Sequence, residues 1–398
     1  MAQKIIYLIL YLYAIWAFPA CQSDVNPDDS GLFIKFLGGA RNETAYALAE
    51  TADGGFVVVG TSESFDQNHQ VYVAKVDRLG NRQWQQSWGD SSRVQGGRDI
   101  LVLDNGHLLV LGFTAPEASP EQGQFLLLEL SADGQVFTDG KIVGDTLLRA
   151  QADMYLSKGQ DNSFYLIGNT LRESRAPTSD MYVVKITDLA THQIAFARSY
   201  GLINRDDQVG SILVDSLTQD IFWCGTSNRN TTLSDMRIVR ADVFGNLRWD
   251  FAIGENNNST ETGADIQVCP DNSGMIAVGT VDHDNEQDVL LVKIDRNGEV
   301  LWRRELGGPE DQEGRSVAPT ADGGYIITGS TVTVAETPLG LTSTPDILLM
   351  KVNALGEPEW TQSFGYRNGP DVGQLVKQSG QDQGYILVGT VWFKIIRL

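Results

Sequence analysis

Short apolar runs recur along the chain and alternate with polar, Gly-rich turns. In one of the clearest copies, the run at residues 325–328 follows the turn Asp322-Gly323-Gly324, and a second run covers residues 347–352. Asx-Gly steps supply the positive φ that tight hairpin turns need. No long segment with a 3.6-residue period competes with these runs. The pattern predicts an all-β chain of antiparallel strands joined by hairpins.

The runs repeat as a unit of four predicted strands that begins at a glycine. The intervals between these glycines vary from 51 residues (Gly38 to Gly89) to 58 residues (Gly307 to Gly365). Four strands in about 50 residues are typical of a propeller blade, whereas a solenoid would need capping repeats. The anchors are Gly38, Gly89, Gly144, Gly201, Gly254, Gly307 and Gly365, and five repeats place an aromatic residue five positions before the next anchor: Trp84, Phe196, Trp249, Trp302 and Trp360.

The last repeat is incomplete, because no fourth strand follows residues 391–398. Residues 31–38 have the sequence of a fourth strand, with Phe33 five positions before Gly38. We therefore predict that residues 31–398 form a seven-bladed β-propeller of four-stranded antiparallel blades, closed by the N-terminal strand completing the last blade. Such closure removes open sheet edges. It requires a very tight hairpin between Gly389 and Trp392, where the usual loop is missing.

The repeat resembles the bacterial β-propeller repeats of the SBBP and delta-sixty type. Those repeats show a leading Gly-Gly, an apolar strand ending in Gly-Thr or Gly-Ser, a strand with Lys, and a closing aromatic. Here these positions are Gly307-Gly308, Gly329-Ser330, Lys351 and Trp360. The resemblance covers residues 31–398 and implies the fold, but no activity. The repeat is also similar to quinoprotein-type repeats, which lack this repeat length and the Gly-Gly start.

The first 20 residues have the pattern of a signal peptide. Lys4 precedes an apolar run at residues 5–18, which is shorter than the about 20 residues of a membrane-spanning helix. Ala20-Cys21 resembles a bacterial lipobox, although Phe18-Pro19 departs from the usual residues. We predict a lipoprotein signal peptide at 1–20, lipidation at Cys21 and a lipidated flexible tether at 21–30. Ordinary secretion is the alternative.

The residues after the cysteine bear on localisation. Gln22 at this position resembles the bacterial sorting signal for the outer membrane, and Asp24, Asp28 and Asp29 resemble the export signals of surface lipoproteins in Bacteroidetes. We expect a lipid-anchored protein of the cell outer membrane, surface-exposed rather than periplasmic. The alternative role of the acidic residues is to keep a linker soluble.

The chain is strongly acidic, with 30 Lys and Arg, 51 Asp and Glu, and a net charge of −21. A field of this sign repels phosphate backbones and argues against a nucleic-acid partner. Cys224 and Cys269 fall in neighbouring repeats without a C-x-x-C pattern, so zinc is not expected. They are either a disulfide pair or two small, half-buried hydrophobic residues.

Three groups of repeated side chains are candidates for chemistry, and each has a structural interpretation. In the first group, an Asp opens the third strand and a basic residue follows five positions later. We expect the Asp to cap backbone N–H groups and the basic residue to pair with a neighbouring blade. The alternative is that these Asp residues form a ring of cation sites. The recurring aromatics are expected in the core, and Trp88, Trp223 and Trp392 are better candidates for a surface role. Acidic residues before the first strands are expected to cap turns, with a cation or glycan site at the channel mouth as the alternative. The residues are Asp180, Asp235, Asp288 and Asp346; Lys185, Arg240, Lys293 and Lys351; and Glu43, Asp206, Asp207, Glu261, Asp265, Asp311, Glu313 and Asp371.

Catalysis has little support in the sequence. The four histidines lie in four different repeats, and no hydrolase, metalloprotease or P-loop motif occurs. We therefore predict no catalytic residue, no cofactor and no metal site. The irregular segments between second and third strands should gather at one end of the propeller, where they suit binding; they are residues 62–70, 115–124, 171–179, 227–234, 281–287 and 331–345.

These observations predict a non-enzymatic interaction module, anchored in the outer membrane through Cys21. The expected partner is an outer-membrane protein complex or a glycan, held at the end that bears the long loops. A carbohydrate-active enzyme with its site at the mouth of the central channel, and a purely structural spacer, remain open.

Overall fold

The structure is a computed structural model. It describes residues 34–39, 41–64, 69–150, 152–170, 179–201, 205–228, 233–254, 259–284, 286–337, 340–365 and 369–391. The chain divides into two compact units, Met1–Phe36 and Leu37–Leu398, and every strand lies in the second. All regular elements in the described ranges are β-strands, so the predicted all-β class is confirmed. No helix found there is long and apolar enough to span a bilayer.

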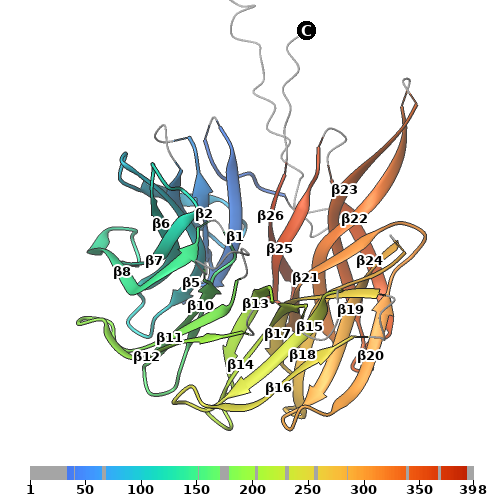
Figure 1. The fold of residues 1–398 in the computed structure, drawn as a ribbon. Coiled ribbons are helices and arrows are strands. Elements are labelled where there is room, and N and C mark those ends of the chain that lie inside the picture. The colour runs from blue at the N-terminus through green and yellow to red at the C-terminus, as the bar shows by residue number, and fades with distance from the viewer. Residues whose placement is uncertain are drawn as a thin grey trace, which may run out of the picture. The chain divides into compact units, whose positions relative to one another are not determined.

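Six four-stranded antiparallel sheets follow one another along the chain, each a meander of consecutive strands (Figure 1). The first three sheets comprise β1 (Glu43–Glu50), β2 (Phe56–Ser62), β3 (Gln70–Val76) and β4 (Arg82–Trp88); β5 (Arg93–Val102), β6 (Leu108–Pro116), β7 (Gln122–Leu130) and β8 (Val136–Arg149); and β9 (Tyr155–Lys158), β10 (Phe164–Asn169), β11 (Met181–Asp188) and β12 (Gln193–Tyr200). The next three comprise β13 (Asp207–Val214), β14 (Ile221–Ser227), β15 (Asp235–Ala241) and β16 (Leu247–Ile253); β17 (Ser259–Val268), β18 (Gly274–His283), β19 (Glu286–Asp295) and β20 (Val300–Leu306); and β21 (Gln312–Pro319), β22 (Tyr325–Thr337), β23 (Gly340–Val352) and β24 (Pro358–Phe364).

The predicted number of blades is wrong: the structure has six four-stranded blades, not seven. After the sixth blade, β25 (Val372–Gln378) and β26 (Tyr385–Thr390) form a sheet of only two strands. The described residues 34–38 of the predicted closing strand are not in a strand, and residues 31–33 and 392–398 lie outside the described part. The sequence carried one warning, because the segment after Gly389 lacks the loop that follows every other second strand.

The two-stranded sheet packs between the sixth blade and the first. Val388 of β26 belongs to one buried cluster with Leu48 and Val58 of the first blade. Val376 of β25 belongs to another with Ile326 of the sixth blade. In Figure 1 the red strands β25 and β26 accordingly lie beside the blue β1. The cores of the other neighbouring blades are shared in the same way, since each buried cluster combines side chains of two successive sheets.

A β-bulge interrupts the first strand of most sheets and explains the Gly that lies opposite it in the second strand. In the sixth blade the register shifts between Gly314 and Ser316, so Arg315 is the extra residue opposite Gly329. A Cβ on Gly329 would lie 1.9 Å from the carbonyl oxygen of Glu313, which leaves room only for glycine. Such bulges turn a side chain out of the regular alternation. The extra residues are Tyr46, Arg98, Gly210, Ala264, Arg315 and Gln374.

The recurring aromatics pack between blades, as predicted. Trp302 of β20 is partly buried against the core shared by the fifth and sixth blades. Gly356 lies in the turn between β23 and β24, and a Cβ added to it would be 2.8 Å from the ring of Trp302. Gly356 also has a positive φ of 75°. The glycine of this turn thus serves both the backbone geometry and the aromatic of the preceding blade.

Candidate functional site

A cavity of about 240 Å³ lies among the first strands of the six blades and β25. Its wall is formed mainly by the bulged residues and by the three residues that follow them. We call the end of each blade that carries the first-to-second and third-to-fourth turns the turn end, and the opposite end the loop end. Because the wall residues follow the bulges towards the turns, the cavity occupies the half of the channel nearer to the turn end.

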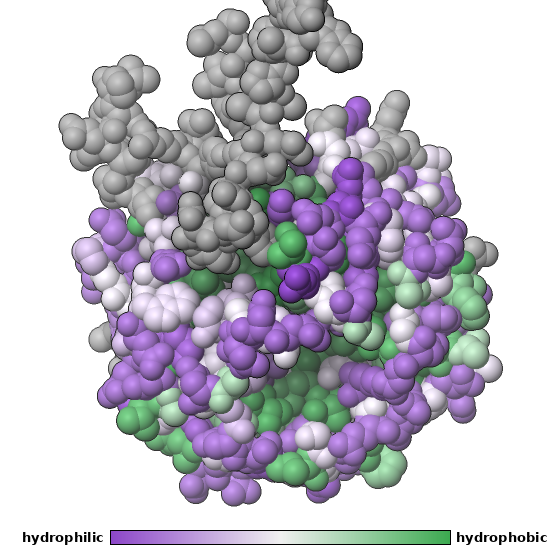
Figure 2. Space-filling model, turned by 180° about the vertical axis from the view of Figure 1, so that it is seen from behind, coloured by the Kyte–Doolittle hydropathy of each residue, from purple (hydrophilic) through white to green (hydrophobic). Residues whose placement is uncertain are grey.

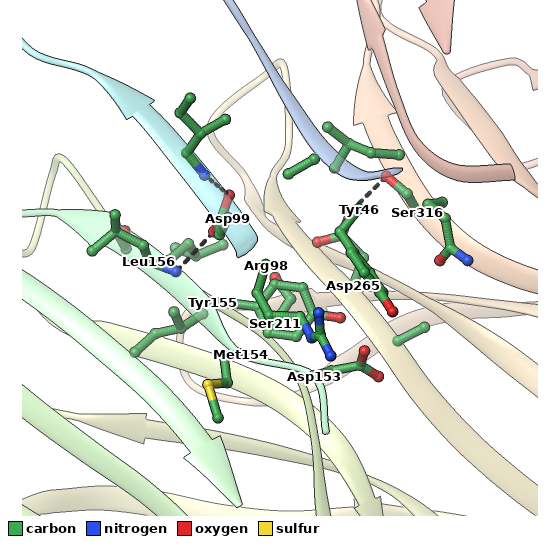
Figure 3. A pocket seen from close by; sticks show the side chains of 18 of the residues that line it. Tyr46, Arg98, Asp99, Asp153, Met154, Tyr155, Leu156, Ser211, Asp265 and Ser316 are labelled. Carbon is green, nitrogen blue, oxygen red and sulfur yellow. Dashed lines mark hydrogen bonds between the residues drawn. The ribbon is translucent and has the colours of Figure 1, made fainter. Parts of the chain in front are cut away.

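Arg98 is the central cation of this cavity (Figure 3). It is 5% exposed, and its guanidinium lies 4.1 Å from the ring centre of Tyr46 and 4.7 Å from that of Phe113. Nε donates to the carbonyl oxygen of Ala152 at 3.2 Å, and Nη1 donates to Thr61 Oγ1 and to the Gly97 carbonyl oxygen, both at 3.0 Å. All these hydrogen-bond acceptors are neutral. Burial lowers the pKa of Arg98, and Asp153 is among the groups that oppose this shift.

Asp99 and Asp265 line the cavity, but both carboxylates are engaged in joining blades. Asp99 accepts hydrogen bonds from the backbone N–H of Ile100 at 2.7 Å and of Leu156, in the next blade, at 2.8 Å. Asp265 accepts four, including Ser316 Oγ and the N–H of Val317 in the next blade, both at 3.1 Å. Burial raises the pKa of Asp99 to about 6 and also raises the pKa of Asp265.

Asp153 is the acidic group that remains available in the cavity. Its side chain is accessible at the wall, and within the described residues no hydrogen bond or ion pair engages its carboxylate. The surrounding protein is nevertheless dense enough that burial raises the pKa of Asp153, against the opposing charges of Arg98 and Arg315. Tyr155 lies beside it, and burial raises the pKa of its hydroxyl well above the ordinary value. Tyr155 therefore stays neutral and can exchange hydrogen bonds at any physiological pH.

The cavity is basic relative to the rest of the chain. It is lined by four basic side chains, Arg98, Lys158, Arg315 and Lys377, and by three acidic ones, Asp99, Asp153 and Asp265. Lys158 pairs with Asp104 at 2.6 Å and Arg315 with Glu313 at 3.2 Å, whereas Lys377 forms no ion pair within the described residues. This balance contrasts with the net charge of −21 of the whole chain.

Of the acidic residues predicted before the first strands, only Asp265 lines the cavity. Others make the expected capping contacts. Glu43 accepts hydrogen bonds from the Gly39 N–H and Ser62 Oγ, and Asp311 accepts one from the Gln287 N–H. Asp207 and Glu261 are buried instead in ion pairs, Asp207 with Arg237 at 2.9 Å and Glu261 with Arg303 at 3.3 Å.

The Asp residues that open the third strands lie against the anchor glycines, and a Cβ on Gly254 would come 2.1 Å from Asp235 Oδ1. The predicted pairing of the basic residues with a neighbouring blade is only partly correct: Lys185 and Arg240 donate to carbonyl oxygens of the next blade, but the ion pairs lie within a blade. Lys185 pairs with Asp161 at 3.1 Å and Lys293 with Asp271 at 3.0 Å, in each case within the same blade.

The loop end differs from the prediction in one of its segments. The segment expected to be a loop at 331–345 continues the β22–β23 hairpin as far as Thr337 and Gly340. The large apolar side chains that are exposed in the described blades lie mostly at the turn end, for example Leu79, Leu217, Phe244 and Leu355. Elsewhere hydrophilic residues cover most of the face seen in Figure 2, with hydrophobic ones mainly in recesses between them.

The remaining candidates give no second site. Trp223 is completely buried, so its proposed surface role is wrong, while Trp392 and the lipidation candidate Cys21 lie outside the described residues. Cys224 and Cys269 are buried free thiols. Within the described ranges, no group of three or more His, Cys, Asp or Glu side chains is arranged to hold a metal ion.

The sequence analysis missed Arg98 and Asp153. One signal for Arg98 was present: a large polar residue directly follows the first-strand glycine in Gly97-Arg98, Gly314-Arg315 and Gly373-Gln374. Aligning these positions identifies the residue that the bulge turns towards the channel. Asp153 had no such signal, because the third blade does not have the glycine at this position.

The fold is that of a β-propeller with a cavity of about 240 Å³ among its inner strands. It is similar to a streptogramin B lyase structure, at 13% identity over 86% of this chain and 89% of that one, with a TM-score of 0.51. It is also similar to the S511A mutant of a puromycin hydrolase in complex with PGG, at 12% identity and a TM-score of 0.53; the match covers 88% of this chain but only half of the hydrolase. At these identities the likeness shows the fold alone. No protein-family model matches the sequence, and neither does any curated protein.

Proposed function

We propose that the protein is a non-enzymatic, lipid-anchored binding module of the bacterial outer membrane, and that its central cavity binds a glycan. The observation that carries the proposal is the cavity itself. Arg98, Asp153 and Tyr155 present charged and neutral hydrogen-bonding groups to one recess. Convergent polar groups in a recess are typical of small-molecule sites.

The engagement of the carboxylates supports binding rather than hydrolysis. Most glycoside hydrolases use two carboxyl groups that flank the reacting bond. In the cavity, both oxygens of Asp99 and of Asp265 already accept hydrogen bonds, and one oxygen of each carboxylate is bonded to the next blade. This leaves Asp153 as the one lining carboxylate free of such bonds among the described residues.

The glycan site is tested by filling it. Ala264 is the bulged residue of the fifth blade and lines the cavity. The detergent-solubilised lipoprotein, applied to a glycan array, should bind a defined group of glycans, and Ala264→Trp should abolish this binding. Glu117→Trp places the same side chain at an exposed site outside the cavity and serves as the matched control. An array without binding, or unchanged binding by a folded Ala264→Trp variant, would show that the cavity is not a glycan site.

The membrane part of the proposal rests on the sequence around Cys21. The wild-type protein should float with outer-membrane vesicles and be digested by protease added to intact cells. Cys21→Ala should move it to the soluble fraction. Recovery of wild type and variant in the same fraction would contradict lipid anchoring, independently of the glycan result.

A carbohydrate-active enzyme is the second candidate. Burial raises the pKa of Asp153, and a carboxyl group with a raised pKa can serve as a general acid. Incubation of the bound glycan with the protein, followed by mass spectrometry, separates the two functions. Unchanged glycan is expected. Products that disappear in Asp153→Asn would establish the enzyme instead.

A protein partner is tested by a crosslinked pull-down from membranes. Recovery of one protein complex, equally with wild type and Ala264→Trp, would point to a protein partner.

A further inference from the structure

We infer that the glycan bound in the cavity is acidic and that its carboxylate is bound by Arg98, assisted by the charge of Arg315. This inference rests on the proposed function and names the class of its ligand.

The first argument is the unfinished coordination of Arg98. Its Nε and Nη1 donate to neutral oxygens, and within the described residues Nη2 donates to none. No carboxylate of the described residues forms an ion pair with this guanidinium, although Arg98 is only 5% exposed. A buried cation whose N–H groups lack an acceptor is stabilised most by a negatively charged ligand atom that accepts from them. A carboxylate at Nη2 would supply both the charge and the missing acceptor.

The second argument is the orientation of Arg98. Contacts with the rings of Tyr46 and Phe113 and three hydrogen bonds hold the guanidinium in place. Figure 3 shows it near the middle of the pocket, close to Asp153 and Tyr155. A preorganised guanidinium loses little side-chain entropy when it binds a ligand.

The third argument is the charge that remains once the internal partners are assigned. The hydrogen bonds that join blades use Asp99 and Asp265, so Asp153 is the one unengaged carboxylate of the described wall. Lys377, which forms no ion pair within the described residues, adds positive charge at the same wall, and so does Arg315, whose pair with Glu313 is solvent-exposed. Hydrogen bonds from neutral donors leave the charges of Asp99 and Asp265 in place, so the positive charge that a ligand can use is local to Arg98 and Lys377 rather than a property of the whole cavity.

The unengaged carboxylate indicates what else the ligand carries. Asp153 accepts hydrogen bonds and repels a second negative group, so it suits hydroxyl donors. A sugar acid has a carboxylate for Arg98 and hydroxyls for Asp153 and Tyr155. The volume of about 240 Å³ is just below the range of about 300–1,000 Å³ typical of ligand pockets, which favours a unit of monosaccharide size.

The test compares acidic and neutral sugars that differ only at C6. The full-length lipoprotein in non-ionic detergent is titrated calorimetrically with D-glucuronate, D-galacturonate, D-glucose and D-galactose. We expect at least one uronate to bind at least tenfold more tightly than its neutral counterpart. Arg98→Gln should abolish this preference and Arg98→Lys should restore part of it, because lysine keeps the charge but loses the planar fork.

Two further variants keep the test decisive if Arg98→Gln folds poorly. Arg315→Gln changes an exposed side chain and should weaken uronate binding several-fold while leaving binding of neutral sugars unchanged. Arg78→Gln removes the same charge from an exposed site outside the cavity and should leave both unchanged. Equal binding of uronates and neutral sugars, or a preference that survives in both Arg98→Gln and Arg315→Gln, would overturn the inference and leave the proposed function standing. If neither these sugars nor any arrayed glycan binds, the proposed function is wrong, and the inference is wrong with it.

Discussion

Lys351 Nζ lies 2.9 Å from Asp322 Oδ2, and the two residues come from different parts of the same blade. Lys351 is in β23 with its side chain 2% exposed, whereas Asp322 is in the turn between β21 and β22 and its side chain is 57% exposed. The ammonium also contacts Glu359 Oε2 at 3.0 Å and donates to the Val352 carbonyl oxygen at 3.0 Å. A buried lysine therefore ties the third strand to the turn of the first hairpin.

The same relationship recurs in four other blades. The pairs are Lys75–Asp53, Lys185–Asp161, Arg240–Asp220 and Lys293–Asp271, with distances from 2.7 to 3.1 Å. The Asp of the turn and the basic residue of the third strand are thus one structural unit of the repeat. This explains why both recur in the sequence without forming a ligand site.

Replacing Lys351 by methionine should destabilise the protein by about 1–2 kcal/mol. The variant keeps an apolar stem of similar length but removes the donor from the Val352 carbonyl and from Asp322. Urea unfolding at pH 7 measures the effect. Lys141→Met, at an exposed site in β8, is the control and should change stability by less than about 0.5 kcal/mol. Equal effects of both substitutions would contradict a structural role of the pair.

The contribution of this pair should disappear in acid. Hydrogen bonds from Thr320 and Lys351 lower the pKa of Asp322 from 3.8 to about 2. A lowered carboxyl pKa in the folded state adds stability that is present above pH 4 and is lost as the pH falls through about 2. The difference in unfolding free energy between wild type and Lys351→Met should therefore shrink between pH 4 and pH 2. A constant difference across this interval would rule out ionic pairing as its source.

Gly356 and Gly323 allow backbone strain to be separated from packing between blades. Both have positive φ, 75° and 88°, but a Cβ on Gly323 meets nothing within 4 Å, whereas one on Gly356 lies 2.8 Å from the Trp302 ring. Gly323→Ala should cost about 1–2 kcal/mol from strain alone. Gly356→Ala should cost about 1–3 kcal/mol more, because Trp302 must move. If urea unfolding shows the same loss of stability for Gly323→Ala and Gly356→Ala, the ring of Trp302 moves aside without cost.

Asp99 should make stability depend on pH in the opposite direction. Burial raises its pKa from 3.8 to about 6, so the folded protein binds its proton more tightly than the unfolded chain. The resulting stabilisation is complete below pH 3.8 and is lost as the pH rises through 6. The difference between a pKa of 3.8 and one of about 6 corresponds to at most about 3 kcal/mol of unfolding free energy. Relative to Asp99→Asn, which cannot titrate, wild type should lose stability from pH 4 to pH 7, as measured by urea unfolding; parallel pH profiles would contradict the raised pKa.

Local sequence features determined the strands, the turns and the type of fold. The Asx-Gly steps specify hairpins through the positive φ that glycine allows, and the fixed spacing of Trp302 and Trp360 before the next anchor reflects packing on the neighbouring blade. Such short-range signals predicted the four-stranded antiparallel blade correctly. They failed for the number of blades, because strand pairing between distant segments depends on geometry that a repeat count does not contain.

The cavity was decided by the tertiary structure alone. Arg98 and Asp153 are 55 positions apart in the sequence and belong to different blades; a bulge in β5 and the approach of β9 bring them to one wall. The ion pairs were likewise assigned to the wrong partner, since a strand pattern shows which face a lysine lies on but not which turn folds towards it. Sequence periodicity reports neighbours along a strand, whereas charge balance, burial and pKa depend on neighbours in space.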